Sequence, residues 1–462
     1  MMFVKRINLA ILILLLGLLV VTPSALAVDI RVLLGTNSSE INLGIAQGDY
    51  QIFDGATGLV VASVSDGDAI TVNRASSSYY LSVNGKNKGI LTGPVQILAK
   101  EDDSLIAFNS KKYRGSFLVN QDGSSLLAIN KVDIEYYLYG VVGEEIGYST
   151  PIEALKAQAV ASRSFALASR NSNAKYDVKC TSSSQVYTGY IAETYSYSQN
   201  VLAAVNATEG EVIWYKNPNT GQKSIAPAYY HANGGGYTED IANVWNSTVF
   251  PFTGVPSPGD SISPTYQWQV TYSADQVASL AQKYSGKDIG QLEKINVIKT
   301  DNSGNPTVSG RAYKVEIVGS GVTVSATKDS IRSLLGLKST LFDLTYGFGV
   351  WLTNSAGNLV NNTTPQTLKA LAADGTIHTV NGKATDFYVI DSGGTRSISK
   401  TAEGSGDDIV ITGSGYGHGV GMSQWGAKAM AQNGSTYQKI ISHYYCGDGK
   451  NTAFYLGDVS GD

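Results

Sequence analysis

Short apolar runs separated by turn-forming residues characterise the chain after residue 28. Between Asp29 and about Ala107, runs rich in Val, Ile and Leu alternate with clusters of Gly, Asn, Asp and Ser, at spacings of about 8–12 residues. These runs include IRVLL, GLVVASV and GPVQIL. The pattern predicts a small antiparallel β domain over residues 28–107, in which no constellation of reactive side chains stands out.

The pattern changes at Lys111, where YRGSFLVN and SSLLAINKV predict paired strands that lead into a helix. The helix is expected to begin at Pro151, because the missing N–H of proline costs nothing in a first turn. Thr150 is the expected N-cap, and Glu153 would complete a capping box. The following residues, IEALKAQAVASRSFALASR, are mostly small, which predicts a helix buried on most sides.

Later segments alternate strands and short helices. Residues 273–285 and 327–337 predict helices, and the segment RAYKVEIVG predicts a strand between them. The tail carries the glycine-dense GSGYGHGVGMSQWGAKAMA, which enters a helix, and a last short helix reaches His443. No repeat of fixed period is visible, which disfavours solenoids and propellers. The fold class expected is therefore α+β, β-rich with a few short helices.

The first residues have the pattern of a secretory signal. Lys5 and Arg6 precede an apolar run from Leu9 to Val21, and Ala25-Leu26-Ala27 follows as a small-residue cleavage site. Such a run is shorter than the ~20 residues that cross a bilayer. We expect cleavage after Ala27 and a secreted or cell-wall-associated protein, with an uncleaved anchor as the alternative. The expected organisation is a signal over residues 1–27, the β domain, and a second domain over residues 108–462.

Composition narrows the possible ligands. The net charge of −4 becomes −6 once the two basic residues of the signal are removed, so no nucleic-acid partner is expected. Only 16% of residues are charged, against 50 glycines and 28 tyrosines, which suits hydroxyl-rich ligands but also fits an ordinary extracellular protein. Cys180 and Cys446 could form a disulfide, and the sequence leaves this open. No CxxC or HExxH motif is present, so no metal or cofactor is expected.

Two neighbouring acids are the first candidates for chemistry. Glu144 and Glu145 are expected in a loop before the helix, where extended neighbours point in opposite directions, so at most one would face a cleft. One interpretation is two solvated acids favoured by the helix dipole. The other is that one of them is desolvated, with a raised pKa, and acts as a proton donor. On the helix, Lys156 and Arg163 share a face, so burial would require acceptors for both.

Histidines and aromatic residues gather near the glycine-rich segments. His231 precedes three glycines and His418 lies between two, in loops of a kind that often hold ligands; each could equally be a turn histidine. His443 is expected to pack within its helix, and His378 is the fourth histidine. Aromatic rings can stack on sugar rings, although most are expected to be core. The aromatics near these segments are Tyr148, Tyr187, Tyr190, Tyr229, Tyr230, Trp245, Tyr416 and Trp425.

Taken together, these segments resemble the SpoIID/LytB family over residues 111–446. The N-terminal β domain lies outside the resemblance. The stretches that carry it, in family order, are INKVDIEYYLYGVVGEEI, PIEALKAQAVASRSFAL, SQVYTGY, NATEGEVIWY, PAYYHANGGGYTE, VW, GVPSPGD, RAYKVEI, IRSLLGLKSTLFDL and GYGHGVGMSQWGAKAMAQNGSTYQKIISHYY.

The resemblance implies a SpoIID-type catalytic domain that acts on peptidoglycan glycan strands as a lytic transglycosylase, especially on strands lacking stem peptides. Glu145 would be its single catalytic acid and base, where ordinary glycosidases need two carboxylates ~5–5.5 Å or ~6.5–9.5 Å apart. Nine residues would bind substrate: Arg163, Gln185, Tyr187, Tyr230, His231, Gly235, His418, Ser423 and Gln424.

Two departures from the family pattern bear on this interpretation. Ile146 and Gly147 follow the glutamate where the family usually has Met-Pro, and Ser182-Ser183-Ser184 stand where some members carry zinc ligands. One alternative is a non-catalytic wall-binding module, similar to the amidase enhancer of the family, that activates a cell-wall amidase. Another is a hydrolase that uses the scattered histidines as metal ligands.

Overall fold

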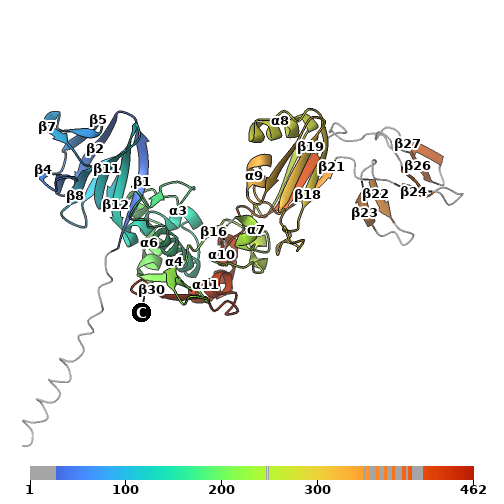
Figure 1. The fold of residues 1–462 in the computed structure, drawn as a ribbon. Helices are drawn as coiled ribbons and strands as arrows, with labels where there is room; N and C mark the ends of the chain where they lie inside the picture. Colours follow the sequence, from blue (N-terminus) through green and yellow to red (C-terminus); the bar gives the residue numbers. More distant parts are fainter. Residues whose placement is uncertain are drawn as a thin grey trace, which may run out of the picture.

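The computed structural model describes residues 28–245, 247, 249–346 and 409–461, together with six short strands between residues 350 and 397. The expected signal segment, residues 1–27, lies outside the described residues. Figure 1 shows a β-rich N-terminal part, a central part containing most of the helices, and a second lobe built from residues after the centre of the chain. The predicted α+β class is confirmed.

The N-terminal part consists of two sheets that share one hydrophobic core. Most of its strands alternate between buried and more exposed residues, as half-buried strands should. One sheet has the order β13-β1-β12-β11-β8-β3-β4, with β13 Val178–Lys179, β1 Asp29–Asn37, β12 Ser125–Asp133, β11 Ser116–Asp122, β8 Val95–Ala99, β3 Tyr50–Asp54 and β4 Val60–Val64. The other has the order β10-β9-β2-β5-β6-β7, with β10 Lys111–Arg114, β9 Leu105–Phe108, β2 Glu40–Gln47, β5 Ala69–Ala75, β6 Ser78–Val83 and β7 Lys86–Leu91.

The predicted antiparallel β structure is therefore present, and it continues past the expected boundary. Residue 107 lies inside β9, and the predicted strand pair after Lys111 joins the N-terminal sheet. β12 pairs antiparallel with β1 from Asp29↔Asp133 onward. The site-bearing helices thus begin directly at the end of a strand of the N-terminal sheet.

The central part surrounds one long helix, α4 (Ile152–Ala168), and most residues of this helix are buried, as predicted. The capping prediction is wrong in detail: Pro151 is the N-cap, and the Thr150 hydroxyl instead donates to the Ile146 carbonyl, 2.9 Å away. Against α4 pack α2 Ile134–Tyr139, α3 Val142–Ile146, α6 Gln199–Asn206, α10 Gln424–Gln432 and α11 Tyr437–Cys446, and the short helix α5 Ile191–Thr194 precedes α6. The strands of this part are β14 Glu211–Lys216, β15 Lys223–Ile225, β30 Phe454–Asp458, β16 Tyr230–His231 and β29 Met422–Ser423.

The second lobe has its own hydrophobic core. The predicted helix over 273–285 is confirmed as α8 (Ala274–Ser285), with a capping box at Ser273, and the second predicted helix is the shorter α9 (Ser330–Leu335). Its two sheets are β17-β28-β21, with β17 Gln267–Tyr272, β28 Ile409–Ser414 and β21 Phe342–Tyr346, and β18-β19-β20, with β18 Leu292–Ile298, β19 Lys314–Gly319 and β20 Thr323–Thr327. The links to the centre contain α7 Ile241–Val244 and the 3-10 helix η1 Pro258–Ile262.

Three antiparallel strand pairs lie between β21 and β28. They are β22 Val350–Thr353 with β23 Leu359–Thr363, β24 Lys369–Leu371 with β25 Ile377–Thr379, and β26 Tyr388–Asp391 with β27 Gly394–Ser397. His378 belongs to β25, and its side chain is outside the described part of the chain. Cys180 and Cys446 are both free thiols. Within the described residues, no helix has the length and apolar character to cross a membrane.

Candidate functional site

The two candidate acids lie on a short helix rather than in the expected loop. In α3, the Glu145 N–H donates to the Val141 carbonyl at 3.0 Å, so both side chains project from a helical turn. Each is half-buried and each has its own partner, which excludes the interpretation of two solvated loop acids. Glu144 accepts a hydrogen bond from the Tyr148 hydroxyl at 2.8 Å, whereas Glu145 accepts one from the Val186 N–H at 2.6 Å.

Glu145 lies beside a buried network centred on Gln185. The Gln185 amide accepts from the Tyr137 hydroxyl and donates to the Tyr230 hydroxyl, both at 3.0 Å, and Gln185 is fully buried. Glu145 is close enough to these tyrosines for its charge to raise their pKa values, after the larger effect of burial. The structure therefore brings Gln185 and Tyr230, two of the expected binding residues, next to Glu145.

The surroundings of Glu145 favour its protonated form. Burial raises the pKa of the Glu145 carboxyl above its ordinary value, and the negative charge of Glu144 adds to this rise. The hydrogen bond from the Val186 N–H acts in the opposite direction, because it stabilises the carboxylate. The net effect is a side chain that keeps its proton to a higher pH than a solvated glutamic acid, as a general acid requires.

The two glycine-rich segments meet in a short parallel strand pair. β16 pairs with β29, so that Tyr230 faces Met422 and His231 faces Ser423. His231 Nδ1 lies 3.0 Å from the Val420 carbonyl, which can only accept, so this nitrogen carries the proton. His418 Nδ1 accepts from the Val420 N–H at 3.0 Å. The two imidazole rings lie 5.4 Å apart, centroid to centroid.

Both histidines are neutral at neutral pH. Burial lowers the pKa of His231 well below its usual value and lowers the pKa of His418 to about 4. His231 Nε2 is buried without a hydrogen-bond partner in the structure. Among the described side chains, no group of three or more His, Cys, Asp or Glu residues is arranged to hold a metal ion.

Ser423, Gln424 and Gly235 hold this loop pair together from within. The Ser423 hydroxyl donates to the buried Asp260 carboxylate and accepts from the Gly426 N–H at 3.2 Å, which caps α10. Gln424 donates to Gln158 of α4 at 3.3 Å. Gly235 has φ +77°, and a Cβ there would lie 2.7 Å from the Leu341 side chain and 3.1 Å from the Ser414 backbone, so a larger residue would be strained.

Asp260 is a site residue that the sequence did not single out. Its carboxylate is wholly buried, accepts from the Gly236 N–H at 3.1 Å as well as from Ser423, and its pKa is raised by burial. The residue lies in the GVPSPGD stretch, but nothing in that stretch distinguishes it from an ordinary turn aspartate.

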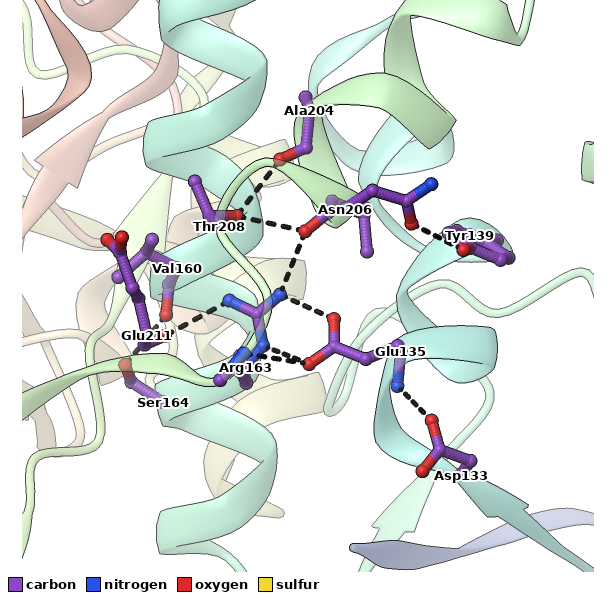
Figure 2. A network of polar contacts seen from close by, with 12 residues as sticks. Asp133, Glu135, Tyr139, Val160, Arg163, Ser164, Ala204, Asn206, Thr208 and Glu211 are labelled. Carbon is purple, nitrogen blue, oxygen red and sulfur yellow. Dashed lines mark hydrogen bonds and ion pairs between the residues drawn. The ribbon is translucent and has the colours of Figure 1, made fainter. Parts of the chain in front are cut away.

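Arg163 points away from Glu145. It is wholly buried, and its guanidinium donates to both carboxylate oxygens of Glu135, at 2.8 and 2.5 Å, and to the Glu211 carbonyl at 3.0 Å (Figure 2). The side chain of the neighbouring Ser162 lies close to the Tyr230 hydroxyl, and successive helical side chains diverge by about 100°, so Arg163 faces another side of α4. The acceptors that burial requires are present, and likewise Lys156 pairs with Glu153 at 2.7 Å.

Tyr187 is also internal. Its hydroxyl donates to Asn130 at 3.0 Å, and its ring packs against Tyr113 and Tyr137, with centroids 5.8 and 4.9 Å away. Its side chain is 3% exposed. Arg163 and Tyr187 thus support the elements around the site from the protein interior, and the structure places neither of them beside the Glu145 carboxyl.

A cluster of three tyrosines, Tyr148, Tyr195 and Tyr197, lies on the side of Glu144. The rings of Tyr195 and Tyr197 stack with centroids 5.0 Å apart and an interplanar angle of 21°. Tyr148 packs edge-on against both, at 5.5 and 5.1 Å. Tyr197 is 56% exposed, so this tyrosine cluster presents an aromatic face to solvent beside α3. No motif in the sequence marks Tyr195 or Tyr197.

Comparison with known proteins agrees with this architecture. A family model described as stage II sporulation protein matches residues 122–215, the segment that carries Glu145, Arg163 and Gln185. A second, described as a domain of unknown function (DUF8618), matches residues 257–349, which include η1 and most of the second lobe. Residues 122–215 thus match the stage II sporulation protein model, and the chain is similar to proteins of the SpoIID/LytB family.

Curated relatives support the same assignment. The chain is similar to the amidase enhancer of Bacillus subtilis, with 29% identity over 67% of this chain and 39% of that protein. It is 26% identical to stage II sporulation protein D of Bacillus amyloliquefaciens, over 69% of this chain and 74% of the relative. An uncharacterised protein of Brachyspira hyodysenteriae is 28% identical over 73% of this chain and 72% of its own length. The match thus spans well under half of the amidase enhancer.

Proposed function

We propose that this protein cleaves peptidoglycan glycan strands as a lytic transglycosylase, with Glu145 as its single acid and base. The observation that carries the proposal is the setting of the Glu145 carboxyl. It is half-buried beside the Gln185 network, it is oriented by the Val186 N–H, and its pKa is raised. Glu144 is engaged by Tyr148, so the two neighbouring acids have separate roles.

The chemistry requires only one carboxyl group. Protonated Glu145 donates its proton to the glycosidic oxygen between N-acetylmuramic acid and N-acetylglucosamine as the C1–O bond breaks. The 6-hydroxyl of the muramic acid then attacks its own C1 and closes a 1,6-anhydro ring. The Glu145 carboxylate accepts the proton of that hydroxyl and returns to its starting state. No water is consumed, so the second carboxylate of an ordinary glycosidase is not needed.

The surrounding residues suit a sugar polymer. The exposed tyrosine cluster offers ring faces on which the C–H face of a sugar can stack. His231 Nε2, which has no hydrogen-bond partner in the structure, can accept a hydrogen bond without adding charge. The names of the relatives, stage II sporulation protein D and amidase enhancer, support a role in the cell wall and in sporulation. We propose export by the N-terminal signal as the route to that substrate.

The second candidate is a non-catalytic enhancer that grips glycan and activates a wall amidase. It is favoured by the similarity to the amidase enhancer and by Ile146-Gly147, which replace the Met-Pro usual after the family glutamate. In that case the same loops would bind glycan, and Glu145 would contribute hydrogen bonds rather than a proton.

The two candidates are separated by digestion of purified peptidoglycan with residues 28–462. We expect soluble products with 1,6-anhydro-muramic ends from the wild type and a reduction of about 10²–10⁴-fold for Glu145→Gln. Glu144→Gln is the matched control, because it removes the neighbouring charge and keeps the proton donor; it should retain most activity. Equal product from the wild type and Glu145→Gln would refute the enzyme. Pelleting with insoluble wall without any product would support the enhancer.

A further inference from the structure

A lysine and a tryptophan on α10 form a small cationic site next to Gly147, the residue that follows α3. Trp425 and Lys428 are three residues apart, so they share one face of the helix. The Lys428 ammonium nitrogen lies over the indole ring, 4.3 Å from its centroid. Both side chains are half-buried, and the ring restricts the positions that the ammonium can take.

The charge of Lys428 has no counterion in the part of the chain that the structure describes. Among the residues that the structure describes, no carboxylate lies within ion-pair distance of its nitrogen. Burial lowers the pKa of Lys428, since water is partly removed and no anion replaces it. A half-buried ammonium held in one place without an anionic partner is suited to an anionic ligand.

The position of Lys428 ties this ligand to the candidate site. Its nitrogen is 4.0 Å from the point where a Cβ would stand on Gly147, an exposed residue two positions after Glu145. The Cα atoms of Gly147 and Glu145 are at most ~7.6 Å apart, because each step along the chain spans ~3.8 Å. Lys428 forms no ion pair with Glu145 or Glu144, and burial alone lowers its pKa, so neither carboxylate neutralises its charge.

We propose that Lys428, positioned by Trp425, binds the lactyl carboxylate of an N-acetylmuramic acid unit whose stem peptide has been removed. This inference rests on the proposed function, since it takes glycan as the ligand. Muramic acid carries a free carboxylate only when the peptide is absent, because the peptide converts that group into a neutral amide. A charge-assisted contact at this point therefore selects peptide-free units and rejects substituted ones.

The test measures binding of two ligands in a Glu145→Gln background, in which cleavage does not interfere. The ligands are muramic-acid-containing oligosaccharides with the lactyl carboxylate free, and the same oligosaccharides with that group converted to a primary amide. We expect the parent to prefer the free carboxylate by on the order of tenfold or more. Lys428→Gln should abolish this preference by weakening binding of the charged ligand alone. Lys439→Gln, which removes an exposed lysine of α11, should leave the preference unchanged.

The outcomes separate this inference from the proposed function. A preference that survives Lys428→Gln, or equal binding of both ligands by the parent, overturns the carboxylate subsite and leaves glycan cleavage standing. If the Glu145→Gln parent binds neither ligand, this result contradicts both the proposed glycan binding and the carboxylate subsite.

Discussion

Replacing Glu135 with glutamine removes the charge partner of a wholly buried guanidinium. Arg163 is 0% exposed, and Glu135 accepts from two of its nitrogens, while two backbone carbonyls, of Val205 and Glu211, take the remaining hydrogen bonds (Figure 2). If Arg163 is structural, as this arrangement indicates, the change should reduce the free energy of unfolding and leave the glycan site intact.

The size of the effect follows from burial. Removing one partner of a buried ion pair costs about 3–5 kcal/mol, since the other charge stays buried and uncompensated. Glutamine keeps the shape and one acceptor, so about 3 kcal/mol is expected, which corresponds to a melting temperature lower by on the order of 10 °C. The matched control is Asp122→Asn, which breaks the exposed Lys175–Asp122 pair and should cost less than about 1 kcal/mol.

The assay combines thermal unfolding with sedimentation on insoluble wall, measured well below the melting temperature of each variant. Glu135→Gln should melt earlier than the wild type and still bind wall with wild-type affinity. An unchanged melting temperature together with lost wall binding would refute the structural role and return Arg163 to the set of ligand-binding residues.

Three further predictions concern the site and its frame. The melting temperature of Glu145→Gln should rise relative to that of the wild type as the pH rises from about 4 to about 8. Protonated Glu145 stabilises the folded wild type fully below the ordinary carboxyl pKa, and this stabilisation is lost as the pH passes the raised pKa. Parallel curves of melting temperature against pH would contradict the burial of this carboxyl. Gly419→Ala should lower the free energy of unfolding by about 1–3 kcal/mol in a denaturant titration, because φ is +90° and the new Cβ would lie 2.6 Å from Arg311 Nε. The control is Gly434→Ala, which has φ +82° but faces open space and should cost less. Tyr197→Ala should weaken wall binding several-fold through loss of ring stacking on sugar, with an unchanged melting temperature. Equal binding by the wild type and this variant would show that the tyrosine cluster does not contact the ligand.

Elements with a clear period or cap could be predicted from the sequence. The small-residue pattern after Pro151 indicated a buried helix, and the pattern over residues 273–285 indicated α8. By contrast, α3 has only five residues, too few to show helical periodicity, so Glu144 and Glu145 were expected in a loop. The predicted strand pair is confirmed as β11 with β12, but the sequence pattern did not show that β1 and β8 would flank the pair in the N-terminal sheet.

The site shows the same limit. The resemblance to the SpoIID/LytB family predicted Gln185 and Tyr230 as binding residues, and the fold places both beside Glu145. It also pointed to Arg163, but the direction of that side chain depends on the rotation of α4, which the motif does not specify. Asp260 meets Ser423, 163 residues away, and no local pattern predicts a contact of that range.

The central claim is tested most directly by digesting peptidoglycan in water enriched in oxygen-18. A lytic transglycosylase closes the 1,6-anhydro ring without adding water, so the account predicts anhydro-muramic ends that carry no label and that disappear with Glu145→Gln. Labelled reducing ends, or anhydro ends that persist in Glu145→Gln, would contradict it.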